Sequence, residues 1–86
     1  MASKTVIEYI PGELLQDGKK IYDIKLRLTI KEMMVDELST PVARAIARRD
    51  LMTTNIADGR YTLRYFFDGK KEEPSVRIER GTMLAG

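Results

Sequence analysis

The sequence predicts an α+β fold of the order ββαββ, in which two antiparallel hairpins form one sheet and a helical segment covers its apolar face. Two segments that alternate apolar and polar residues predict strands, and two Asp-Gly dipeptides predict hairpin turns. Between the hairpins, two helix-start signals predict the helical segment. The 86 residues suit a single domain over residues 1–86, with one small core.

Residues 22–30 give the clearest strand pattern, because five apolar side chains alternate with polar ones and so share one face. Residues 61–67 repeat the pattern with aromatic side chains. Each strand has a weaker neighbour across an Asp-Gly turn. The first neighbour is residues 5–10, which Pro11-Gly12 is expected to interrupt before Leu14-Leu15 resume extended structure. The second is residues 76–80, where Pro74 suits only the start of a strand or an edge.

The helical segment is predicted from Thr29-Ile30-Lys31-Glu32, which fits a capping box, and from Thr40-Pro41, which offers a second helix start. Two interpretations follow. One short helix ends near Leu38 and another runs over residues 41–52, or a single helix is kinked at Pro41. The acids at positions 32, 36 and 37 precede the arginines at 44, 48 and 49, as a helix dipole favours. The apolar residues exceed one narrow stripe, which favours a homodimer.

Composition narrows the function classes. The chain has no histidine and no cysteine, which removes the residues on which most soluble enzymes build nucleophiles, proton shuttles and transition-metal sites. We therefore expect no catalytic residue, no metal site and no cofactor. The formal net charge of +2 does not by itself indicate nucleic acid or membranes. Without a signal-like or membrane-spanning apolar run, we expect a cytoplasmic protein that does not bind membranes.

The basic residues are the most suggestive polar group. Alternation places several of them, together with one phenylalanine, on the outer side of the predicted sheet, and two more lie four residues apart on the predicted helix. The candidate binding residues are Lys25, Arg27, Arg60, Arg64, Phe66, Arg77, Arg44 and Arg48. They suit a solvated face with cross-strand ion pairs, an interface with a protein partner, or a nucleic-acid surface on which bases stack against Phe66.

Tyrosines supply a further possibility, because Tyr22, Tyr61 and Tyr65 are all expected on the core side, where buried hydroxyls need polar partners. The sequence as a whole favours a non-catalytic binding or adaptor protein that acts as a homodimer. One alternative is a nucleic-acid-binding protein with an arginine-rich sheet face. The other is a small-molecule binder or histidine-free enzyme with a pocket of tyrosines and acids.

Overall fold

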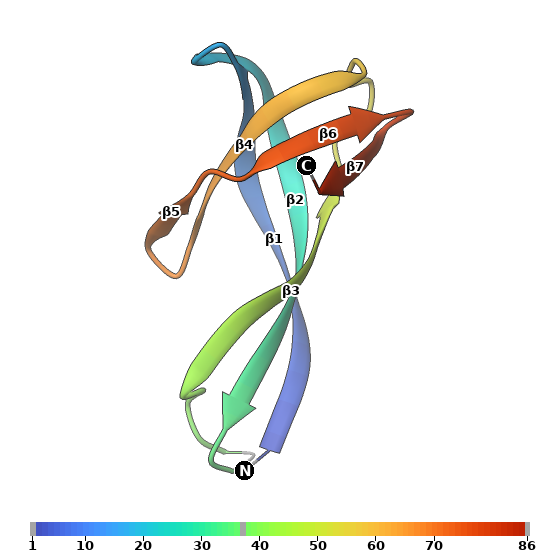
Figure 1. Ribbon diagram of the computed structural model, residues 1–86. Coiled ribbons are helices and arrows are strands. Elements are labelled where there is room, and N and C mark those ends of the chain that lie inside the picture. Colours follow the sequence, from blue (N-terminus) through green and yellow to red (C-terminus); the bar gives the residue numbers. More distant parts are fainter. Residues whose placement is uncertain (1, 37, 86) are drawn as a thin grey trace.

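The computed structural model describes residues 2–36 and 38–85, and its regular structure there is entirely β (Figure 1). The strands are β1 (Ala2–Gln16), β2 (Lys19–Met34), β3 (Ala43–Leu51), β4 (Gly59–Phe67), β5 (Lys70–Glu72), β6 (Ser75–Glu79) and β7 (Thr82–Ala85). None of these residues belongs to a helix of the length and apolarity that crossing a membrane requires.

One antiparallel sheet contains all seven strands, in the order β3-β2-β1-β4-β6-β7, with β5 paired to β4. The sheet curls until β3 approaches β7, so the body is a nearly closed barrel. The molecule is nevertheless elongated, 43 × 23 × 18 Å, because β1, β2 and β3 continue past the point where β1 stops pairing with β4. We call this extension the arm, defined as residues 2–11, 25–34 and 43–51, and Figure 1 shows it below the body with the N-terminal end at its tip.

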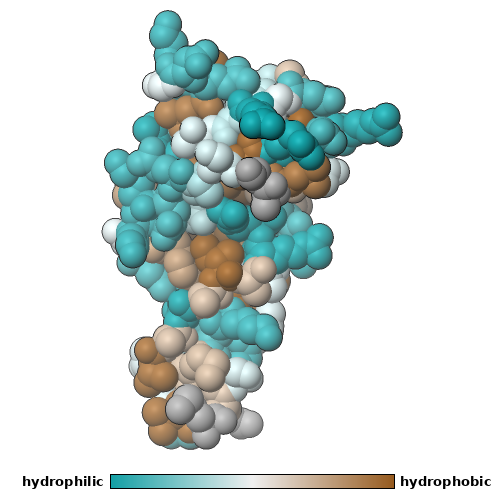
Figure 2. Space-filling view, in the orientation of Figure 1, coloured by the Kyte–Doolittle hydropathy of each residue, from teal (hydrophilic) through white to brown (hydrophobic). Residues whose placement is uncertain are grey.

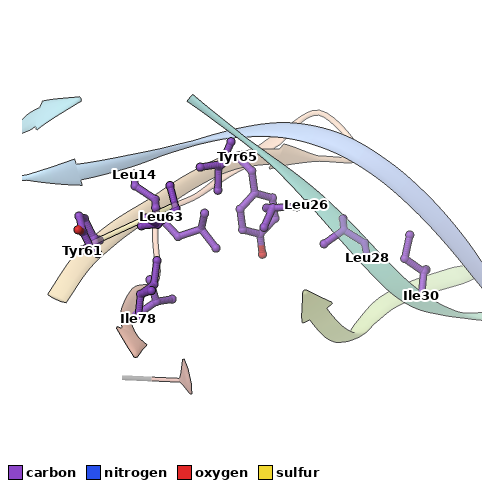
Figure 3. Packing of buried hydrophobic residues seen from close by; sticks show 11 residues of the cluster. Leu14, Leu26, Leu28, Ile30, Tyr61, Leu63, Tyr65 and Ile78 are labelled. Carbon is purple, nitrogen blue, oxygen red and sulfur yellow. The ribbon is translucent and has the colours of Figure 1, made fainter. Parts of the chain in front are cut away.

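The core lies inside the curled sheet, where alternate side chains of neighbouring strands meet (Figure 3). Leu26, Leu28 and Ile30 of β2, together with Leu63 of β4 and Ile78 of β6, are fully buried. The faces predicted for residues 22–30 and 61–67 are therefore confirmed, since the apolar member of each alternating pair points inward.

The predicted α+β class is wrong, because residues 29–34 continue β2 as a strand. Thr29-Ile30-Lys31-Glu32 is not a helix cap, and the inward alternation of Ile30, Glu32 and Met34 simply extends that of the preceding residues. Pairing with both β1 and β3 satisfies this backbone and outweighs the local capping signal. Glu37, in the expected helix, lies outside the described residues.

The helix predicted over residues 41–52 is also wrong, because this segment forms β3. A bulge shifts the register, so that Ile46 pairs with Ile30 whereas Arg48 pairs with Thr29, and Ala47 is the extra residue. The bulge puts an odd spacing between the inward residues Ile46 and Leu51, which hides the alternation of a strand. The alanines at positions 43, 45 and 47 also have high intrinsic helix propensity, which strand pairing overrides here.

The hairpin predictions are partly confirmed. Asp17-Gly18 and Asp68-Gly69 both have positive φ angles, as tight hairpin turns require, and they join β1 to β2 and β4 to β5. The expected break at Pro11-Gly12 is wrong, since β1 passes through it without interruption. Proline is tolerated there because its missing N–H lies on a side of β1 that has no partner at that position.

Candidate functional site

The eight predicted binding residues do not form one patch. Lys25, Arg27, Arg60, Arg64, Phe66 and Arg77 lie on the outer side of their strands, as predicted. Because the sheet curls, however, those on β2 and those on β6 belong to different sides of the molecule. Arg44 and Arg48 belong to strand β3 rather than to a helix, and they point to opposite faces of it.

Carboxylates of the chain itself neutralise several of these arginines. Arg64 donates from Nε and Nη2 to Oε1 of Glu13 at 2.8 and 2.7 Å, across the β1–β4 pair. Arg48 donates to Asp50 at 3.0 Å, and Arg77 lies 3.2 Å from a carboxylate oxygen of Glu79. A continuous basic face that could follow a nucleic-acid backbone is therefore interrupted at three places.

Arg44 points inward and is the centre of a charge cluster that no pattern in the sequence predicts. It contacts Glu8 of β1, Glu32 of β2 and Asp68 of the β4–β5 turn, and its guanidinium lies over the Phe67 ring, 5.1 Å from the ring centre. These partners come from three other segments of the chain. Arg44 therefore holds the β4–β5 hairpin against the inner face of the arm.

Within the cluster, Glu32 is the buried member, with only 8% of its surface exposed. Nε of Arg44 lies 3.0 Å from Oε2 of Glu32, without the alignment of a hydrogen bond, and Nζ of Lys4 lies 3.8 Å from Oε1. A buried carboxylate needs such compensation, since an isolated charge is costly inside a protein. The cluster is therefore a structural device rather than a free binding site.

The tyrosine hydroxyls bond to the protein itself. The Tyr61 hydroxyl donates to the carbonyl oxygen of Ala57 at 2.7 Å, and the Ala57 N–H donates to the Tyr22 hydroxyl at 3.3 Å. Arg49 reaches the Tyr65 hydroxyl at 3.4 Å. Burial, followed by the neighbouring Tyr22, raises the pKa of Tyr61 above its ordinary value of 10.0. These contacts favour a packing role for the tyrosines over a pocket of free hydroxyls.

No family model, curated protein or solved structure matches this chain. Its function therefore has to be inferred from features that folding alone does not explain. Two such features are the edge of β1 along the arm, whose backbone groups have no partner strand, and two arginines that face each other on β4 and β6.

The first 10 residues of β1 form an open edge of the sheet. β1 pairs with β2 along its whole length, but β4 pairs with β1 only at residues 12–15 and then turns inward toward Arg44. Within the described part of the chain, no strand pairs with residues 2–11 on that side. The free edge of β3 differs, because it faces a groove of about 740 Å³ lined by residues such as Tyr65, Phe67 and Met83 of the same chain.

The direction of the β2 backbone shows which β1 groups are free. Carbonyl oxygens of Lys25 and Met33 accept from the N–H groups of Met52 and Val42, so odd-numbered β2 residues face the β3 side. Even-numbered β2 residues therefore bond to their even-numbered β1 partners. The N–H and C=O groups of Ser3, Thr5, Ile7 and Tyr9 consequently point out of the sheet edge, and Pro11 ends this row of donors.

Apolar side chains accompany the open edge. On the outer face beside it, Ile7 is 40% exposed and Tyr9 is 59% exposed. At the tip of the arm, the exposed apolar residues are Met33, Val35, Leu38 and Val42, and Figure 2 shows apolar surface at this narrow end. Proteins usually blunt a long edge with charges, bulges or an early proline, and residues 2–10 have no bulge.

Proposed function

We propose that the protein is a non-catalytic binding module that acts as a homodimer, with the open edge of β1 as its interface. The observation that carries this proposal is the row of unpaired backbone groups from Ser3 to Tyr9. An unpaired edge is a template for a further strand, and a second copy of the chain supplies an identical one. A two-fold axis then makes the pairing antiparallel and self-complementary.

The sequence of the edge selects one register. Because odd-numbered residues carry the free backbone groups, odd must pair with odd and even with even. Centring the two-fold axis on Val6 pairs Thr5 with Ile7 of the second copy and Ser3 with Tyr9, through about eight backbone hydrogen bonds. It also sets Lys4 directly opposite Glu8 of the second copy, twice in the interface. Shifting the axis by one residue loses this charge complementarity.

Side-chain packing supports the same register. Val6 is half-buried against the core and would meet its own copy in a close, non-hydrogen-bonded pair. The exposed side chain of Ile7 would lie beside the Thr5 of the second copy, which covers apolar surface that is open in the monomer. Ala2, the first residue of β1, would lie opposite Ile10 of the second copy, just before the residues at which the partner's β1 pairs with β4.

The resulting assembly is a continuous six-stranded sheet, made of two arms, with a barrel-like body at each end. Such a bridge holds two copies of the body's outer surface at a fixed separation, which suits a binding or adaptor role. Arg64 and Arg77 on that surface are paired with Glu13 and Glu79, which supports protein or small-ligand contacts more than a nucleic-acid track.

Sedimentation equilibrium of the wild type, Thr5→Pro and Thr5→Ala tests the proposal. Proline at position 5 removes an edge N–H but no hydrogen bond to β2, whereas alanine keeps the edge intact. The wild type and Thr5→Ala should sediment at twice the 9.8 kDa chain mass, and Thr5→Pro at the chain mass. Ile7→Pro provides a second edge variant, and far-UV circular dichroism checks folding. A wild-type monomer, or a folded Thr5→Pro dimer, would overturn the proposal.

A further inference from the structure

A pair of arginines lies face to face on the outer side of the body. β4 and β6 are antiparallel neighbours, and their register sets Arg60 directly opposite Arg77. One step along the same face, Thr62 is directly opposite Ser75. Two guanidinium groups and two hydroxyls therefore share one small area.

The backbone pattern brings these side chains close. The N–H of Leu63 donates to the carbonyl oxygen of Pro74 at 2.9 Å, so odd-numbered β4 residues bond toward β6. Arg60 and Thr62 therefore belong to non-hydrogen-bonded pairs, in which facing Cα atoms are only about 4.5 Å apart. Like charges at such positions repel and destabilise a sheet.

The chain only partly compensates for this repulsion. Nε of Arg77 lies 3.2 Å from Oε1 of Glu79. This contact does not use the two terminal nitrogens of the Arg77 guanidinium. Arg60 makes no ion pair with any residue that the structure describes. An anion placed between the two guanidinium groups would convert their repulsion into attraction.

The surface is hollowed at this place. A groove of about 510 Å³ is lined by residues 15–17, 60–62 and 75–77, a size typical of small-molecule sites. The Gln16 side-chain amide donates to the carbonyl oxygen of Arg60 at 3.1 Å, which fixes the end of β1 beside the groove. A second hollow shares Arg60 and Arg77, but Asp58 and Glu79 line it, so an anion is favoured on the Thr62 and Ser75 side.

We propose that Arg60 and Arg77, with Thr62 and Ser75, bind the terminal phosphate group of a small molecule. Arginine binds phosphate oxygens through two parallel N–H donors, and two arginines match the charge of a phosphate monoester. A nucleic-acid backbone is disfavoured, because the next outward residue of β4, Arg64, is already bound by Glu13. The site is on β4 and β6, away from the β1 edge, so it does not depend on dimerisation.

Titration of inorganic phosphate into the full chain tests the site, at constant ionic strength, while the arginine side-chain N–H signals are followed by NMR. Arg60 and Arg77 should shift with a common saturation curve, whereas Arg64 should not. Arg60→Gln and Arg77→Gln should each weaken binding about tenfold or more, since each removes charged hydrogen bonds. Arg64→Gln is the matched control, and its phosphate affinity should stay unchanged.

Stability separates lost binding from lost folding. Without phosphate, Arg60→Gln should be at least as stable as the wild type, because it removes a like-charge pair. Phenyl phosphate should bind at least as tightly as inorganic phosphate if the natural ligand is a phosphate monoester. Equal shifts at Arg64, or no saturation, would overturn the site. Tighter binding of a single-stranded oligonucleotide that also shifts Lys25 and Arg27 would replace it with a nucleic-acid surface.

Discussion

Arg44→Met should destabilise the fold by about 2 to 4 kcal/mol, because it leaves the buried carboxylate of Glu32 without its main partner. Breaking a fully buried ion pair costs about 3 to 5 kcal/mol. Here the Glu32 side chain is 11% exposed, so most of that cost applies. The side chains of Glu8 and Asp68 are 41% and 45% exposed, so their ion pairs with Arg44 contribute only about 0 to 1 kcal/mol each to stability. Methionine keeps much of the packing against Phe67 but loses the cation–π contact.

Urea denaturation of the wild type, Arg44→Met, Glu32→Gln and the double variant measures this effect. The double variant should recover part of the loss in unfolding free energy, since a neutral glutamine does not leave a buried charge. Arg48→Met is the control on the same strand, because its side chain is 73% exposed and its pair with Asp50 is on the surface. If Arg44→Met cost no more than Arg48→Met, the cluster would not be what holds the β4–β5 hairpin to the arm.

Two further stability predictions concern the core and the tyrosines. Leu26→Ala and Leu63→Ala should each lower the free energy of unfolding by about 2 to 5 kcal/mol, because both side chains are fully buried. Arg27→Ala should lower it far less. Urea denaturation measures all three, and the opposite ranking would contradict the assigned strand faces. Tyr61 has its pKa raised by burial, so the unfolded state loses its proton first; the free energy of unfolding should fall as pH rises above about 10. Tyr61→Phe should flatten this slope, and an unchanged slope would contradict the assignment.

Sequence patterns predicted the parts of the fold where side chains alternate without interruption. Leu26 and Leu63 were placed inward because five-residue and four-residue apolar sets repeat with a period of two. At β3 the bulge at Ala47 breaks this period, and the helix predicted there is wrong. The helix start predicted at Thr29 came from a different signal, a capping box. A capping box is local, whereas the pairing of β2 with strands on both sides is a tertiary feature.

The candidate sites show the same limit. Alternation placed Arg60 and Arg77 on the outer side, but their direct opposition depends on where β6 pairs with β4 after β5 and Pro74. Two of the three carboxylates around Arg44 are distant in sequence: Asp68 is 24 residues away and Glu8 is 36 residues away. Residue spacing along one strand therefore cannot reveal the cluster. The edge of β1 is open because β4 pairs with it only at residues 12–15. The point at which two strands stop pairing depends on the tertiary structure and has no local sequence signal.

Oxidative cross-linking of Val6→Cys tests the proposed dimer most directly, because the chain has no other cysteine. In the register centred on residue 6, the two thiols face each other across a close pair whose Cα separation suits a disulfide. Lys4→Cys is the matched control, since its copies would be separated by several residues along the strands. The proposed dimer predicts a covalent product for Val6→Cys under mild oxidation and none for Lys4→Cys. Equal cross-linking of both variants, or of neither, would contradict it.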